Sequence, residues 1–523
     1  MHSLSWIDWS IIGGYGVGML LLGSWFARRQ TSTEEYYVGK RRMNSFIIGI
    51  SLFATLLSTI TYLALPGEMI NKGPVTLCGL LGIPIAYILV GYFLIPALMK
   101  RRVTSAYELL EDRLGPSARL MAAAMFLMLR FMWMGLLVNV AAKAIVVMLG
   151  LDIAMVPWIV VICCVIAVAY TTLGGLRAVV ITDVVQFFLL LVGALLTIAL
   201  VSVEMGGFDW FPRSWSPHWD AQPVFSLNPH IRMTIVGAIV LKVLWSTCTY
   251  GADQTAIQRF MATGNARAAR RSLLVNFIAV IVITVVLALV GFALLGFYSN
   301  NPQLIRGEGG LAQQADNLFP QYIVGQLPVG VAGLVVAALF AAAMSSIDSG
   351  INSATAVIQV DLIDRFRLRR NRNQHNLWLA RWLSLGIGGV IILMNSFVDK
   401  VPGNILEVTN KVSNLLVWPL FGLFFLALFV RFVTPFGAIF GTIYGIGAAI
   451  LVAFWDMITL GEPLSFQWIA VVSLSVSIIA GVLLSLLRTR GRHAFLLIGY
   501  AIAASLPVIL LFLWAFSLRS GNI

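Results

Sequence analysis

Residues 54–61 read Ala54-Thr55-Leu56-Leu57-Ser58-Thr59-Ile60-Thr61, and Pro66-Gly67 follow them. They place hydroxyl and β-branched side chains in the middle of an apolar segment, residues 44–70. In lipid every backbone polar group needs a hydrogen-bond partner, so a spanning helix that is interrupted in this way usually lines a cavity. The stretch therefore predicts a broken helix beside a binding site.

A second apolar segment, residues 233–260, is interrupted in the same manner. It contains Trp245-Ser246-Thr247-Cys248-Thr249-Tyr250-Gly251-Ala252-Asp253-Gln254. A single serine or threonine in a membrane helix often bonds only to the preceding turn of its own helix. Two clusters in corresponding segments instead favour a transporter binding site between two halves of the chain.

The composition indicates that these segments cross a membrane. The chain has 523 residues, of which 59% are hydrophobic and 11% are charged, and this composition excludes a soluble multidomain enzyme. A spanning helix needs about 20 apolar residues. Hydropathy, together with turn and charge signals, predicts 14 such segments: residues 7–27, 44–70, 75–99, 117–149, 153–173, 178–204, 233–260, 272–298, 328–363, 376–398, 403–430, 433–456, 468–487 and 494–518.

The positions of the basic residues predict the orientation of the chain. Of the 35 lysines and arginines, 25 fall on one set of alternate loops and 6 on the other. This is the positive-inside pattern, so the basic excess needs no nucleic-acid partner. It places the N-terminus outside, and 14 crossings return the C-terminus to the same side. We expect an integral protein of a bacterial inner membrane, as a monomer or weak oligomer in the lipid bilayer.

The two interrupted segments each begin a block of five predicted helices, residues 44–204 and 233–430. Because five is an odd number, the two blocks would have opposite orientations, as in an inverted repeat. One extra helix at 7–27 precedes the blocks, and three more at 433–518 follow them. The predicted fold class is an all-α polytopic membrane protein with a single transporter domain, residues 1–523, and about 14 transmembrane helices.

The ninth predicted helix carries the most polar stretch, Ala341-Ala342-Ala343-Met344-Ser345-Ser346-Ile347-Asp348-Ser349-Gly350-Ile351-Asn352-Ser353. Spacings of three and four place Ser345, Asp348, Ser349 and Asn352 on one stripe. A carboxylate in the membrane costs roughly 2.5 to 3.5 kcal/mol on insertion scales, so we expect Asp348 to have a cation or a donor. Asp183 in the sixth helix is a second such carboxylate. Oxygen-only ligands suit a hard cation.

The chain resembles the solute:sodium symporter family across essentially its whole length. The matching stretches are Tyr170-Thr171-Thr172-Leu173-Gly174-Gly175-Leu176-Arg177 with Thr182-Asp183, then Ala252-Asp253-Gln254 with Gln258-Arg259 and Ala268-Ala269-Arg270-Arg271, and Met344-Ser345-Ser346. The resemblance implies a LeuT-like fold, with two inverted five-helix repeats plus extra helices. This agrees with the repeat inferred from the helix count.

The resemblance also implies two sodium sites. In the first, Ala54, Leu57 and Ala342 supply backbone carbonyls, and Ser345 and Ser346 supply hydroxyls. Some members of the family have a second site further in, and the matching positions are Asp183, Ser345, Asp348 and Ser349. Asp348 stands at a position where such members can have a serine, so the site would carry two carboxylates. The identity and number of the ions bound there stay open.

The solute-binding residues are expected on the two interrupted helices and on the fourth. The second helix lacks the amide and acid of the sugar-carrying branch, so the chain resembles more the branch for carboxylates, vitamins, sialic acid and small anions. The predicted solute contacts are Ser58, Thr61, Arg130, Ser246 and Thr249. Arg130 lies close to mid-membrane, where its planar fork would suit a carboxylate. Alternatively Arg130 forms a salt bridge with Asp183 or Asp348, and Lys143 and Lys242 reach toward the membrane surface.

Together these features predict a sodium-coupled symporter, not an enzyme. It would import a small polar organic solute, a carboxylate or other organic anion, by alternating access with Na⁺ as the coupling ion. A sodium-coupled carrier of a sugar or another neutral solute is the first alternative. A transporter-like sensor and a passive channel are the others.

Overall fold

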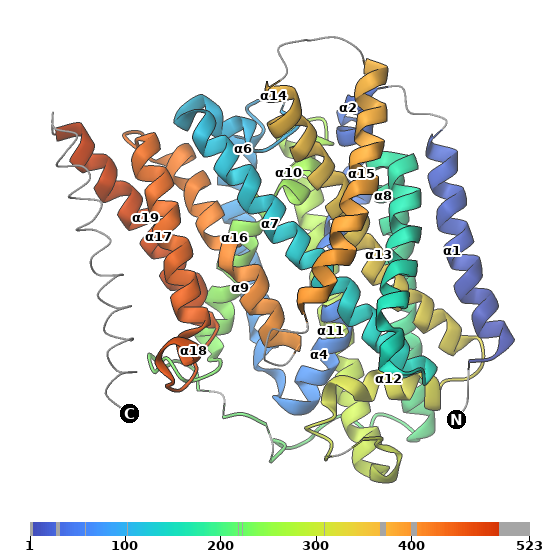
Figure 1. The fold of residues 1–523 in the computed structure, drawn as a ribbon. Helices are drawn as coiled ribbons and strands as arrows, with labels where there is room; N and C mark the ends of the chain where they lie inside the picture. The colour runs from blue at the N-terminus through green and yellow to red at the C-terminus, as the bar shows by residue number, and fades with distance from the viewer. Residues whose placement is uncertain are drawn as a thin grey trace.

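The computed structural model describes residues 4–27, 32–57, 59–101, 103–217, 219–221, 223–307, 309–366, 373–398 and 405–490, and all regular secondary structure within them is helical. The α-helices, labelled as in Figure 1, are α1 (Trp6–Ala27), α2 (Thr33–Val38), α3 (Ser45–Leu56), α4 (Thr59–Asn71), α5 (Ile83–Ile88), α6 (Ile95–Leu98), α7 (Glu108–Leu149), α8 (Val156–Glu204), α9 (Ile235–Ala252), α10 (Gln254–Met261), α11 (Ala266–Asn300), α12 (Ala315–Gly325), α13 (Val331–Val357), α14 (Asp364–Phe366), α15 (Asn373–Val398), α16 (Ile405–Phe429), α17 (Pro435–Ala453), α18 (Trp455–Thr459) and α19 (Gln467–Arg490). Between α4 and α5 lies the 3₁₀ segment η2 (Pro74–Gly82), and η2 begins a continuous helical span that ends with α6.

Ten helices of the described residues are long and apolar enough to cross a membrane, and the bent pair of α3 and α4 is an eleventh candidate. The predicted segments 153–173 and 178–204 both fall in one helix, α8. Its 49 residues would extend about 74 Å, more than twice the hydrocarbon core of about 30 Å. Gly175 interrupts α8 with φ 54° and ψ −164°, so α8 can supply two crossings. Segment 494–518 lies outside the described residues, and the count of fourteen stays a prediction.

Both interrupted segments form broken helices, as the sequence predicts. The axes of α3 and α4 are bent by 67°, and Leu57 at the break is extended, with φ −77° and ψ 124°. Asp253 separates α9 from α10 with φ −78° and ψ 121°. Its carboxylate accepts a hydrogen bond from the Thr255 amide at 2.8 Å, so Asp253 ends one helix and caps the next. The boundaries of the two five-helix blocks themselves stay a prediction.

Helix α13 lies at the centre of the bundle. It packs against α1, α3, α4, α7, α8, α10 and α15, and all of its residues from 341 to 357 are buried. Small residues let neighbouring membrane helices approach closely. At Gly350 an added Cβ would lie 2.4 Å from Met134 Sδ and 3.1 Å from Arg130 Cδ. Glycine therefore lets α7 cross α13 closely, and a larger residue here would displace the Met134 side chain.

The connecting segments separate to the two ends of the bundle. In Figure 1, α12 and α18 lie at one end, and α2 and α14 lie at the other. This separation agrees with the predicted alternation of outer and inner loops. At the α12 end, Arg232 donates to both carboxylate oxygens of Glu68, at 2.8 and 2.9 Å, and Trp219 Nε1 donates to the Ile70 carbonyl at 3.1 Å. The long loop before α9 is therefore tied to the end of α4.

Asp316, in the first turn of α12, lines a small hollow at this end together with Glu68 and Asn71. Burial, and then the neighbouring Glu68 carboxylate, raises the pKa of Asp316 to about 6. The folded protein therefore holds this carboxyl group in an environment that disfavours its charge.

We predict that Asp316→Asn stabilises the protein against heat at pH 7.5, relative to wild type, more than it does at pH 4. In the unfolded chain the pKa of Asp316 is near 3.9, whereas in the folded protein it is about 6. The free energy of unfolding of the wild-type protein therefore decreases as the pH rises from about 4 through about 6. The Asn variant lacks this titrating group and shows no such decrease. Melting temperatures of both proteins in detergent between pH 4 and 8 test this, and a difference that is independent of pH would contradict it.

Candidate functional site

The break between α3 and α4 faces the polar stretch of α13. Ser345 Oγ donates to the Ala54 carbonyl at 3.0 Å and to the Ala342 carbonyl at 3.1 Å. Ser346 Oγ lies 3.1 Å from the Leu57 carbonyl. The five residues predicted to form the first sodium site therefore lie together, although Ala54 and Ser345 are 291 positions apart in the sequence.

The helix break is what supplies these oxygens. The last carbonyls of an α-helix have no donor within the helix, and α3 ends because Leu57 turns to an extended conformation. Ser346 Oγ also lies 3.2 Å from the Thr55 carbonyl. Carbonyl and hydroxyl oxygens are ligands for hard cations, so the donor set fits Na⁺, while the binding of sodium there stays a prediction.

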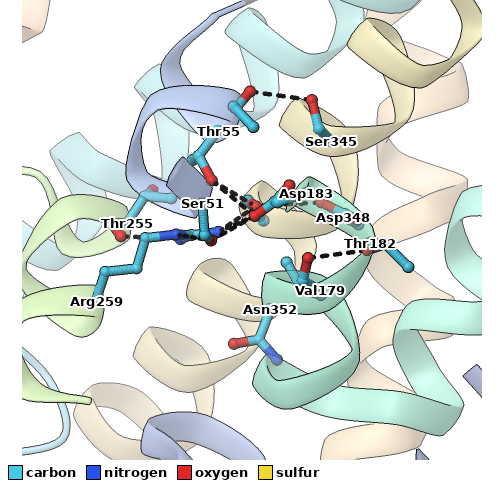
Figure 2. Close-up of polar contacts among 12 residues, drawn as sticks. Ser51, Thr55, Val179, Thr182, Asp183, Thr255, Arg259, Ser345, Asp348 and Asn352 are labelled. Atoms are coloured by element: carbon cyan, nitrogen blue, oxygen red, sulfur yellow. Dashed lines mark hydrogen bonds and ion pairs between the residues drawn. The ribbon is translucent and has the colours of Figure 1, made fainter. Parts of the chain in front are cut away.

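A second polar cluster surrounds the guanidinium of Arg259, which reaches in from α10 (Figure 2). Arg259 Nη2 donates to Asp183 Oδ2 at 3.1 Å and to Ser349 Oγ at 2.5 Å. Its Nε donates to Ser51 Oγ at 2.9 Å, and Ser51 Oγ in turn donates to Asp183 Oδ2 at 2.5 Å. The predicted second-site residues Asp183 and Ser349 are therefore brought together, but around Arg259, which is not among the residues predicted from the sequence to form a site.

Asp348 lies beside this cluster without an arginine of its own among the described residues. It accepts hydrogen bonds from the Tyr170 hydroxyl at 2.6 Å and from the Ser349 hydroxyl at 3.1 Å. Asp183, Asp348 and Arg259 are all fully buried, and Asp183 Oδ1 has no hydrogen-bond partner in the described part of the chain. With all three groups ionised the cluster has one uncompensated negative charge. Such a charge is costly in the interior, so the geometry leaves a role for one further cation or proton.

Arg130 forms a different buried ion pair. It donates from α7 to Asp253 Oδ2 at the α9–α10 break. The alternative stated above, a salt bridge from Arg130 to Asp183 or Asp348, is therefore wrong about the partner, because Arg259 already pairs with Asp183. The pair connects α7 to the second broken helix.

The two glutamines of the Asp253–Arg259 stretch hold α10 in place. Gln254 Nε2 donates to the Thr104 carbonyl at 2.8 Å. Gln258 Nε2 donates to the Tyr37 carbonyl at 2.6 Å and to Asn352 Oδ1 at 2.8 Å. The sequence motif identified this stretch, but its spacing could not give partners that lie so far away along the chain.

A cavity of about 320 Å³ lies beside the α3–α4 break. Its wall includes Leu57 and Thr61 from the broken helix, Thr76 from η2, and Lys242 and Trp245 from α9. This volume falls within the range of small-molecule sites. Leu57 contributes both to the oxygen cluster and to the cavity wall, so the two sites adjoin.

The predicted solute residues have different surroundings. Thr61 lines the cavity. Ser246 and Thr249 are buried on α9, and their hydroxyl oxygens have no hydrogen-bond partner in the part of the chain that is described. Arg130 is 3% exposed and is not among the described residues of the cavity wall. Ser58 lies outside the described residues, and a solute contact by any of these five residues stays a prediction.

Comparison with known proteins places this geometry in a family. Residues 36–445 match the model of the sodium:solute symporter family. The sodium/sialic acid symporter SiaT of Proteus mirabilis (strain HI4320) is 28% identical over 497 residues, which cover 92% of this chain and 95% of that protein. A solved structure of a Na⁺-coupled sialic acid symporter, in a substrate-bound outward-open state, is similar with a TM-score of 0.79 and 27% identity, covering 92% of this chain and 98% of that one. The nucleobase-cation-symport-1 family transporter Mhp1, in a closed conformation, shares the fold alone, with a TM-score of 0.55 and 14% identity over 86% of this chain and 93% of its own.

These matches confirm the predicted LeuT-like fold and the prediction of a transporter rather than an enzyme. They also agree with Na⁺ as the coupling ion and with a transported solute as the partner. Because the family model covers most of the chain, from the segment before the first broken helix to α17, this integral membrane protein belongs to the sodium:solute symporter family.

Proposed function

We propose that the protein imports a small organic anion together with sodium, by exposing the cavity alternately to the two sides of the membrane. The observation that carries this proposal is the position of Leu57. Its carbonyl accepts a hydrogen bond from Ser346, and the same residue lines the cavity. An ion at that carbonyl and a solute in the cavity would therefore contact one broken helix.

Sodium would act on the solute through the shape of this break. The proposed ligands come from two helices: Ala54 and Leu57 at the end of α3, and Ala342, Ser345 and Ser346 on α13. An ion shared between them holds the end of α3 against α13, and the end of α3 forms one wall of the cavity. Coupling between two ligands is reciprocal, so bound solute would increase the affinity for sodium by the same factor.

An anionic solute is supported by the relatives and by the cavity wall. The similar proteins SiaT and the solved symporter are named for sialic acid, which is an acid. The described residues of the wall include no aspartate or glutamate that would repel an anion, and they include the hydroxyl groups of Thr61 and Thr76. The same hydroxyls would serve a neutral solute such as a sugar, which is the second candidate.

We also propose that a second cation binds at Asp348, next to Asp183, Ser345 and Ser349. The support is the uncompensated charge of the buried cluster, together with Asp183 Oδ1, which has no hydrogen-bond partner among the described residues. One sodium with a monovalent anion is electroneutral. A second cation would add a voltage term of about 2.3 kcal/mol per 100 mV, which makes accumulation of the solute far steeper.

The proposed setting is the inner membrane of a bacterium, with both termini outside and the protein working as a monomer or weak oligomer. The orientation follows from the positive-inside distribution of lysine and arginine. In this orientation the loop before α9 and helix α12 lie at the outer entrance, and α10 lies at the inner side.

Replacing both Ser345 and Ser346 by Ala is expected to weaken the apparent sodium affinity of uptake by about tenfold or more, which corresponds to at least ~1.4 kcal/mol. The change removes two of five oxygen ligands. The measurement is uptake of sialic acid or lactate into proteoliposomes at varied external sodium, together with thermal stabilisation of the purified protein by sodium. Ser353→Ala is the control, because Ser353 Oγ donates to the carbonyl of Ser349 in its own helix at 2.6 Å. Unchanged sodium dependence in the double variant would contradict the assignment of these serines to the first sodium site.

Replacing Asp348 by Asn is expected to reduce the positive charge moved per solute by about one, with the first sodium site retained. Asparagine keeps the size of the side chain but removes the charge that the second cation balances. The ratio of charge to solute flux in proteoliposomes at clamped voltages measures this. Asp183→Asn serves as the comparison and should fold poorly, because it leaves Arg259 buried without its carboxylate. An unaltered ratio in Asp348→Asn would exclude Asp348 as the second site.

Single cysteines test the orientation in a background without the native cysteines. Trp215→Cys and Gly310→Cys should react with a membrane-impermeant maleimide added to intact cells, because both lie on loops predicted to be outside. Ala268→Cys, at the start of α11, should react only after the membrane is permeabilised. Labelling of Ala268→Cys from outside would reverse the proposed orientation.

A further inference from the structure

Lys242 is the sole lysine or arginine among the described residues of the cavity wall, which contain no aspartate or glutamate. It lies in the middle of α9, on the same stretch of wall as Trp245. From its position in the sequence, Lys242 is expected to reach toward the membrane surface. In the structure it faces the cavity beside the first sodium site instead.

The three arginines that are buried among the described residues already have carboxylate partners. Arg130 pairs with Asp253, Arg259 with Asp183 at 3.1 Å, and Arg119 with Asp361 at 2.6 Å. For Lys242 the described residues provide no carboxylate within 4.0 Å of Nζ. Its described neighbour is an aromatic ring, since Nζ lies 5.3 Å from the centroid of Trp245.

The backbone and Cβ of Lys242 lie at a close contact between α9 and η2. A Cβ at Gly82 would lie 2.7 Å from the Ile239 carbonyl oxygen, so this position requires glycine. At both Gly79 and Gly82 the same added atom would lie 3.5 Å from Lys242 Cβ. The two glycines therefore bring η2 against the base of the lysine, and the side chain is confined to the cavity side of this contact.

A lysine in this position is costly without a partner anion. A lysine at the centre of a membrane helix is unfavourable, and a cation–π contact offsets only part of that cost. An anion entering the cavity would remove the remaining imbalance. Thr76 Oγ1, in the same wall, is buried without a hydrogen-bond partner in the described part of the chain, so a second donor is available.

We propose that Lys242 binds the anionic group of the transported solute, with Thr76 as a further donor and the Trp245 ring against the body of the solute. This rests on the proposed function, import of a small organic anion, and names the group that selects the charge. It replaces Arg130 in that role, because the charge of Arg130 is already balanced by Asp253. The ligand class is a small carboxylate with a partly apolar body, since most other wall residues are apolar.

The test compares charged and neutral probes on matched variants. Sialic acid and lactate, each with its uncharged methyl ester, are titrated in sodium into purified wild type, Lys242→Gln and Lys242→Arg. We expect Lys242→Gln to weaken binding of the acid at least tenfold and binding of its ester less than threefold, and Lys242→Arg to restore most of the loss. Arg270→Gln is the control, because Arg270 also stacks on an aromatic ring, 4.3 Å from the centroid of Tyr92, but does not line the cavity.

Four outcomes separate this proposal from the proposed function. Equal losses for acid and ester in Lys242→Gln would overturn it and indicate a packing role. If Arg130→Gln weakens binding of the acid but not of the ester, and Lys242→Gln weakens neither, the anionic group binds Arg130 and not Lys242. Wild-type protein that binds only the neutral esters, with sodium dependence, would overturn the role of Lys242 and leave symport intact. Acid binding that needs Lys242 but not sodium would support the lysine and overturn the coupling.

Discussion

The carbonyl groups at the end of α3 are the constraint on which the rest of the structure depends. In lipid, an unpaired backbone group costs several kcal/mol, and the break before α4 leaves such groups in the middle of the bundle. Ser345 and Ser346 of α13 meet them with hydroxyls at 3.0 to 3.2 Å. This requires α13 to lie at the centre, buried from residue 341 to 357, with Gly350 allowing α7 to cross closely. The proposed sodium ligands of α3 and one wall of the cavity result from the same broken helix.

Buried charges inside the bundle, like buried backbone groups, need partners. Removing one partner of a buried ion pair typically costs about 3 to 5 kcal/mol, so Arg259 with Asp183 and Arg130 with Asp253 act as fixed connections between helices. Asp348 departs from this rule, because its described partners are hydroxyl groups. Asp348 lies close to the oxygen cluster at the α3–α4 break, and a transported cation could supply the positive charge that the protein does not provide there.

Helix α9 and its continuation α10 connect these features. In the middle of α9, Lys242 and Trp245 line the cavity. At its end, Asp253 breaks the helix and pairs with α7, and one turn into α10 Arg259 enters the buried carboxylate cluster. A displacement of this broken helix would therefore change the cavity wall and the buried carboxylate cluster together. Such a connected element is what coupling of solute to ion requires.

The sequence by itself determined the membrane class, the two broken helices, the family and the five residues that meet at the α3–α4 break. The first three depend on local composition and short motifs, which are readable along the chain, whereas the five residues follow from the resemblance to the family. Only the tertiary structure decided which charges pair: it placed Arg259 against Asp183, paired Arg130 with Asp253, and turned Lys242 toward the cavity. Pairing of buried charges depends on which helices pack together and at what height. Hydrophobic periodicity does not encode that, because any of several carboxylates at similar depth could satisfy the same arginine.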